Sequence, residues 1–226
     1  MEDEIMANKS NKNEEFIEIK PIEMVTTAIR IVGDTPLIVH AWSVKAKRMM
    51  LEAQMGIKKL KKHDAKNPVE DFIESMYWMS EYPTEMTEEG FEKAVTNGAT
   101  WGFPVTAIKQ AANSAAYRNG LVKNQMALRG AYFIDGVGAD QLSEIKGCVP
   151  NMREDMVKVG MGTADIRHRG EFRNWYMDLT IRYNKNGAYT LEQIINLINL
   201  GGFCCGIGEW RPEKDGQYGM YHVEAI

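Results

Sequence analysis

The chain has 226 residues, of which 44% are hydrophobic and 26% are charged, a composition typical of a folded globular protein. It excludes disorder of the chain as a whole. The three cysteines form no disulfide framework and no C-x-x-C pair, so we expect no metal, no cofactor and a reducing cytoplasm. No apolar run approaches the roughly 18–20 residues that cross a bilayer, so we expect no membrane partner.

Acidic and basic residues are separated along the sequence. The net charge is −4, yet residues 1–25 carry −4 and residues 70–92 carry −8, so the rest of the chain carries +8. Seven basic residues and one acidic residue lie between Lys45 and Lys62. Because charges act over about 8–10 Å at physiological salt, a basic face can bind a polyanion on an acidic protein. The alternative is that these charges belong to ordinary solvated helix faces.

The N-terminal region predicts a tail followed by a strand. Residues 1–15 are polar and acidic and predict a disordered tail. Residues 16–226 are expected to form a single domain. In residues 24–31 the apolar side chains alternate with polar ones, which predicts a half-buried strand.

Helices are expected next, as an insertion over residues 41–100. Residues 43–62 predict a helix with an imperfect apolar stripe. Its members are Val44, Met49, Leu51, Met55 and Leu60. Pro68 suits the first position of a second helix, which Pro83 is expected to end.

The middle of the sequence predicts a helix, a strand and an insertion. Pro104 starts a helix over residues 102–120, and its alanines indicate close packing. Residues 127–136 predict a strand. Residues 151–171 have no clean periodicity and predict a basic hairpin or a long loop.

The last third has the clearest pattern. Residues 173–183 alternate between apolar and polar side chains and predict a strand. Thr190 and Gln193 form a capping box at the start of a helix that Gly201 is expected to end. Residues 217–225 predict a final strand. The order of elements is βαββαβ, which predicts an α+β, ferredoxin-like (RRM-like) antiparallel sheet with helical and hairpin insertions.

Residues 201–219, "GGFCCGIGEWRPEKDGQYG", form a predicted glycine-rich loop after the last helix. Its six glycines allow backbone amides to approach a phosphate closely. Trp210 and Tyr218 offer flat rings on which bases can stack, and Arg211 and Lys214 supply charge. The alternative is that Trp210 fills the core and Pro212 forms a turn.

Three stretches resemble the RAMP superfamily, specifically the subunits that coat RNA as the backbone of CRISPR effector complexes. They are "IRIVGDTPLIVH", "FPVTAIKQAANSAAYR" and the terminal unit ending "LINLGGFCCGIGEWRPEKDGQYGMYHV". The chain is also similar to uncharacterised phage-borne proteins that share the "GEWRP" ending. The resemblance implies a noncatalytic protein that binds a single strand along a basic groove and stacks head to tail into filaments. It also implies a thumb at residues 151–171.

We therefore expect a noncatalytic protein that binds single-stranded RNA or DNA and assembles as a homo-oligomer or filament along the strand, in the cytoplasm of a bacterial host if phage-borne. The expected contacts are Lys45, Lys47, Arg48, Arg167, His168, Arg169, Arg211 and Lys214 for phosphates, and Trp210 and Tyr218 for bases.

Two alternatives remain open. The protein could be a phage-borne interaction protein or inhibitor that acts through protein contacts, with the acidic segment 70–92 facing a basic partner. It could also be a metal-independent ribonuclease, with His168 as the candidate general acid.

Overall fold

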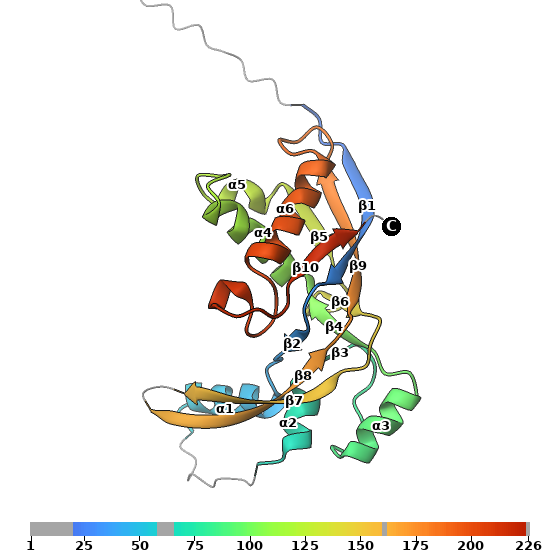
Figure 1. Ribbon diagram of the computed structural model, residues 1–226, viewed down its shortest axis with the longest axis vertical. Coiled ribbons are helices and arrows are strands. Elements are labelled where there is room, and N and C mark those ends of the chain that lie inside the picture. Colours follow the sequence, from blue (N-terminus) through green and yellow to red (C-terminus); the bar gives the residue numbers. More distant parts are fainter. Residues whose placement is uncertain (1–19, 58–65, 160–161, 225–226) are drawn as a thin grey trace, which may run out of the picture.

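The computed structural model describes residues 20–57, 66–159 and 162–224 (Figure 1). Within these residues the chain forms six α-helices, one 3-10 helix and three antiparallel sheets, so the predicted α+β class is confirmed. The predicted tail, residues 1–15, lies outside the described residues, as does Leu60 of the predicted apolar stripe.

The largest sheet has four strands in the order β10-β1-β9-β5, and each neighbouring pair is antiparallel. Its strands are β1 (Met24–Gly33), β5 (Tyr132–Asp135), β9 (Tyr176–Asn184) and β10 (Tyr221–Glu224). The predicted alternation is confirmed on the two central strands, where Ile31 lies opposite Met177 and both are fully buried. Alternate residues are buried because successive side chains of a strand point to opposite faces.

Two helices cover one face of this sheet (Figure 1). They are α4 (Val105–Arg118) and α6 (Leu191–Cys204). As predicted, α6 begins with a capping box in which the side chains of Thr190 and Gln193 accept from each other's backbone N–H groups. The core lies between the sheet and these helices and includes Ile194 and Ile198 of α6.

The prediction that Gly201 ends α6 is wrong, because the helix continues to Cys204. A Cβ on Gly201 would lie 2.6 Å from the backbone nitrogen of Ala112 in α4, and one on Gly202 would lie 2.0 Å from the carbonyl oxygen of Tyr221 in β10. These glycines therefore allow α6 to approach its neighbours closely, and their conformation is helical.

The segment between β1 and α4 contains short strands as well as helices. Its elements after β2 (Leu37–Val39) are α1 (Val44–Gln54), α2 (Pro68–Glu74), β3 (Tyr77–Trp78), α3 (Glu88–Thr96) and β4 (Trp101–Pro104). The predicted second helix stops at Glu74, well before Pro83, because the chain then enters β3 and pairs with β4. The predicted stripe of α1 is not a buried face. Its described members Val44, Met49, Leu51 and Met55 are all exposed.

The described residues of the predicted insertion 151–171 form a long antiparallel hairpin, which is one of the two structures predicted for them. Its strands are β7 (Asn151–Val159) and β8 (Thr163–Phe172), and β8 also pairs with β2 (Leu37–Val39). In Figure 1 this hairpin lies below α4 and α6.

The third sheet has the order β3-β4-β6, with β6 at Leu142–Ile145. The strand predicted over residues 127–136 is shorter than expected, because a helical turn, α5 (Met126–Arg129), occupies its first part.

Candidate nucleic-acid interface

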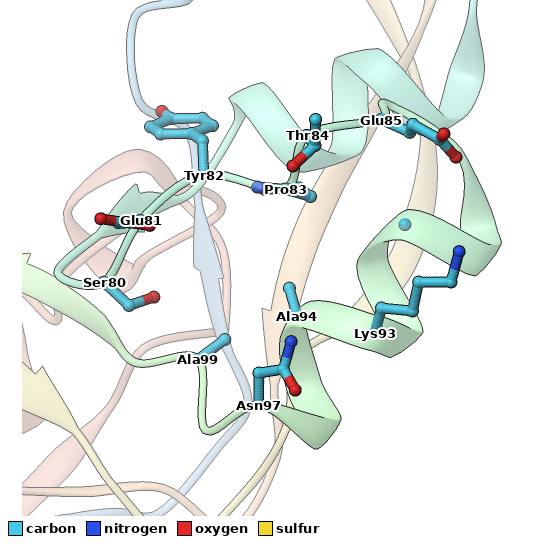
Figure 2. Close-up of a pocket in the computed structure, with 11 residues that line it drawn as sticks. Ser80, Glu81, Tyr82, Pro83, Thr84, Glu85, Lys93, Ala94, Asn97 and Ala99 are labelled. Atoms are coloured by element: carbon cyan, nitrogen blue, oxygen red, sulfur yellow. The ribbon is translucent and has the colours of Figure 1, made fainter.

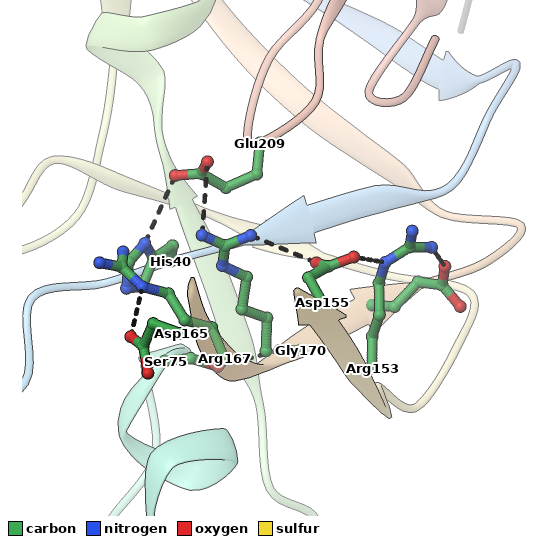
Figure 3. A network of polar contacts seen from close by, with 10 residues as sticks. His40, Ser75, Arg153, Asp155, Asp165, Arg167, Gly170 and Glu209 are labelled. Atoms are coloured by element: carbon green, nitrogen blue, oxygen red, sulfur yellow. Dashed lines mark hydrogen bonds and ion pairs between the residues drawn. The ribbon is translucent and has the colours of Figure 1, made fainter. Parts of the chain in front are cut away.

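A chain of ion pairs joins the glycine-rich loop to the hairpin (Figure 3). Glu209 of the loop lies 3.8 Å from the guanidinium of Arg169 on β8, and Arg169 donates to Asp155 on β7 at 3.2 Å. Asp155 also accepts from Arg153 at 2.9 Å. At the other end, the His40 ring lies 3.4 Å from Glu209. Two segments that are distant in sequence therefore form one continuous surface.

Strand geometry explains why these charges meet. In the hairpin register Arg153 lies opposite Arg169 and Asp155 lies opposite Arg167, so all four side chains share one face. Carboxylates between the arginines neutralise charges that would otherwise repel across the strands. The loop is fixed above this face because the backbone N–H of Glu209 donates to the carbonyl of Ile38 at 2.9 Å.

Arg153 has a role that the sequence patterns did not reveal. Its guanidinium lies 4.6 Å from the centre of the Tyr218 ring and donates to Glu171 at 2.9 Å. Burial alone lowers the pKa of Arg153, but its hydrogen bonds with Asp155, Tyr218 and Glu171 raise it above the ordinary value. Arg153 therefore stays charged and holds the aromatic end of the loop against the hairpin.

Two predicted contacts on β8 need correction. Arg169 is 3% exposed, and its guanidinium is bound by Asp155 and Glu209, so it cannot present a charge to a phosphate. The His168 side chain is 8% exposed, and its Nε2 lies 3.2 Å from Glu154. Both side chains face packed elements, which removes them from solvent. Their ion pairs link the two strands of the hairpin, and the pair of Arg169 with Glu209 links the hairpin to the loop.

The side chain of Arg167 remains partly accessible to solvent. Its side chain is 34% exposed and donates to Asp165 at a long distance of 3.4 Å. Among the three predicted residues 167–169, it is the one placed to meet a ligand.

Of the predicted contact residues in the loop, some are accessible to solvent and others are engaged by neighbouring groups. Trp210 is 41% exposed, which rules out the alternative that it fills the core. Arg211 is held by Glu213 at 3.0 Å and by the carbonyl of Gly208, whereas Lys214 is exposed at the end of a short 3-10 helix that begins at Pro212. Tyr218, whose predicted role is stacking on bases, has Arg153 over its ring.

Helix α1 places the remaining predicted cations at the surface. Lys45 and Lys47 are exposed, and Arg48 is 73% exposed and donates to Glu52 one turn later at 3.0 Å. The helix starts at Ser43, whose side chain accepts from the backbone N–H of Ala46. Ala46 lines the same hollow as Arg167, so α1 begins beside the hairpin.

Sequence patterns missed Trp42 and the role of Glu209. Trp42 is 59% exposed just before α1 and lines the hollow shared with Arg167. Nothing local to Glu209 indicated that a hairpin would pack beside it.

A separate hollow of about 500 Å³ lies between residues 80–85 and helix α3. Figure 2 shows Glu81, Glu85 and Lys93 among the residues around it. It contains none of the predicted contact residues, and its two carboxylates oppose binding of a phosphate. We therefore place the candidate interface on the hairpin, the glycine-rich loop and α1.

The contacts of Glu209 predict a pH dependence. The hydrogen bond from His40 lowers the pKa of this carboxyl, burial opposes that effect, and the charges of Arg169, His40 and Arg211 lower it further. A carboxylate with a lowered pKa stabilises the fold above its unfolded value of about 4.3, and the contribution is lost as the pH falls through the folded value. Glu209→Gln should therefore destabilise the protein near neutral pH and have little effect at about pH 2. Urea unfolding at both pH values tests this, and an equal loss at both would contradict it.

No family model matches the sequence, and no curated protein is similar to it at a significant level. In the described part of the chain, every helix is too short or too polar to cross a membrane.

Proposed function

We propose that this protein binds single-stranded nucleic acid without catalysis and assembles along the strand, on a ferredoxin-like scaffold related to the RAMP superfamily. The observation that carries the proposal is the placement of the hairpin β7–β8. In chain order the four strands of the largest sheet are β1, β5, β9 and β10, with α4 after the first and α6 after the third. The spatial order β10-β1-β9-β5 is the one expected for βαββαβ, and the hairpin enters between the second and third strands.

The surface chemistry supports the same proposal. Lys47, Arg48 and Lys214 are exposed cations, and Arg167 is a partly exposed one. Trp210 adds an exposed ring on the loop that packs beside the hairpin. Binding a single strand requires cations for phosphates and flat side chains for bases, and a stacked base contributes about 1–3 kcal/mol.

The test uses the full-length protein and a fluorescently labelled oligonucleotide. We expect single-stranded RNA or DNA of mixed sequence to bind, with an affinity that falls linearly on a log–log plot against salt concentration. Size exclusion of the complex on strands of increasing length should show one added copy of the protein per fixed increment of nucleotides. Absence of binding to both RNA and DNA at low salt would refute the proposal.

An interaction protein is the second candidate, because one specific observation favours it. Helix α1 has no buried residue; it exposes Val44, Met49, Met50 and Leu51, and its C-cap residue Met55 is exposed as well. Such a Met-rich surface suits an adaptable protein contact. Purified native protein that carries no nucleic acid and binds neither oligonucleotide would favour this candidate. The ribonuclease alternative loses its candidate general acid, because the His168 side chain is 8% exposed.

A further inference from the structure

The outer half of the hairpin is a ribbon of two strands. Strand β2 pairs with β8 only as far as Val39, which lies opposite Gly170. Beyond this point β7 and β8 have each other as their only partners among the described strands, and the ribbon extends away from the largest sheet (Figure 1). A two-stranded hairpin is marginally stable in water, so added strands would stabilise this part of the fold.

The two edges of this ribbon have different surroundings. On the β8 side, Lys66 donates to the carbonyl of Ile166, and residues of α1 and α2 line a hollow together with Arg167. On the other side, no described strand pairs with the outer edge of β7, which is nine residues long. An open strand edge of this length is a template for pairing with another chain. The β7 edge is therefore the one available to a partner.

Apolar side chains are exposed at the middle of the β7 edge. Met156 is 77% exposed, and Ile166, its partner on β8, is 46% exposed. Two residues away on either side of Met156 lie Glu154 and Lys158, which share its face of the ribbon. Lys158 is exposed, and the side chain of Glu154, which also contacts His168, is 66% exposed. The edge therefore carries an apolar centre between an acid and a base.

Symmetry restricts how two copies of β7 can pair with each other. Residues that lie opposite each other in an antiparallel pair point to the same face of the sheet. A two-fold axis perpendicular to the sheet also keeps each side chain on its own face, so one residue must lie opposite its own copy. An axis at Arg153, Glu154 or Asp155 would place two like charges opposite each other, which is unfavourable.

An axis at Met156 avoids that repulsion. It places Met156 opposite its own copy and Glu154 opposite Lys158, once on each side of the axis. An axis at Val157 also avoids like charges, but it places Met156 opposite Lys158 and forms no pair of opposite charges along the described edge. Opposite charges and apolar pairs across strands stabilise a sheet. The sequence of β7 therefore complements itself best in the register centred on Met156.

We propose that two copies of this chain associate through β7, antiparallel about a two-fold axis at Met156, so that their hairpins form one four-stranded sheet. Met156 and Ile166 of the two copies then form an apolar row across the sheet. The contact needs no nucleic acid and goes beyond the proposed function. It is isologous, whereas stacking along a strand is heterologous and uses other surfaces. Arg167 stays available, because it lies opposite Asp155 on the other face of the ribbon.

Sedimentation velocity of the nuclease-treated, full-length protein tests for this dimer. We expect a concentration-dependent equilibrium between monomer and dimer without nucleic acid. Glu154→Lys and Lys158→Glu should each weaken dimerisation about tenfold, because each places like charges opposite each other on both sides of the axis. The two substitutions combined should restore it. Direct contact within one copy cannot explain that rescue, because the two positions lie about 13 Å apart along the strand.

Lys123→Glu is the matched control. It makes the same change of charge as Lys158→Glu at an exposed position outside the hairpin, so it should leave dimerisation unchanged. Met156→Cys reports on the register. Oxidation with diamide, which takes up the two thiol hydrogens, should join two copies through this residue, whereas Lys158→Cys should form no such link. Wild type measures the background from the three natural cysteines.

Wild-type protein that stays monomeric up to about 100 μM would refute the dimer. A dimer that neither charge reversal weakens, or that the combined variant does not restore, would refute the contact through β7. Neither result bears on the proposed function, which is judged from binding of the labelled strand. A dimer that binds no strand would refute the proposed function and leave this inference standing. If a charge variant does not fold, as judged by circular dichroism, the wild-type equilibrium and the Met156→Cys link decide.

Discussion

Replacing Asp155 by Ala is expected to lower the free energy of unfolding by about 3–5 kcal/mol. Asp155 is 7% exposed and accepts hydrogen bonds from Arg153 and from Arg169, whose side chain is also buried. Without the carboxylate, Arg169 would keep its charge in the interior with Glu209, at 3.8 Å, as its remaining acidic neighbour among the described residues. The cost comes from that uncompensated buried charge more than from the lost bonds themselves.

Asp135→Ala is the matched control for this prediction. Asp135 also lies on a strand and accepts from an arginine, Arg182, but both side chains are well exposed. Exposed pairs contribute about 1 kcal/mol or less, so this variant should be nearly as stable as wild type. Urea unfolding followed by circular dichroism compares the two. Equal losses would mean that the ion-pair chain between the hairpin and the loop has no special structural role.

Combined replacement of Lys47, Arg48 and Arg167 by Ala should weaken binding of a single strand by at least about tenfold at low salt. It should also reduce the log–log salt slope by about 2, because each phosphate contact on a single strand contributes about 0.7. The pair of Arg48 with Glu52 does not prevent this role, because the Arg48 side chain is itself 73% exposed and ion pairs one helical turn apart are weak, about 0.3–0.5 kcal/mol.

A second triple variant controls for net charge. Lys93, Lys123 and Lys185 are exposed cations that line neither the hairpin face nor the hollow beside it. Their replacement by Ala removes the same total charge, yet it should change the salt slope little. If both variants lose affinity equally, binding follows net charge and the interface is not the one described here.

The arginines of the interface therefore fall into two groups with different roles. Arg153 and Arg169 are engaged by carboxylates and hold the hairpin to the loop. Arg167 and Arg48 keep exposed surface and are the ones available to a polyanion. Mutating the first group should disturb stability, whereas mutating the second should disturb binding.

The sequence could predict which basic residues cluster at the candidate site, but it could not predict which of them are accessible to a ligand. Arg167, Arg169 and His168 are adjacent in the sequence, so a local pattern treats them as one basic cluster. In the hairpin they alternate between faces, and packing against Asp155, Glu209 and α2 decides which of them stays accessible. Exposure of a charge depends on neighbours that are distant in sequence.

The sequence by itself predicted strands at 24–31 and 173–183, which the structure places at Met24–Gly33 and Tyr176–Asn184, and it predicted the start of α6. Alternation and a capping box are set by residues a few positions apart. Tertiary structure decided the rest. Helix α6 continues through Gly201 because α4 packs against it there, and the apolar residues of α1 stay exposed because no described element covers them. It also decided that Glu209 lies between His40 and Arg169, since only folding brings the loop, β2 and β8 together.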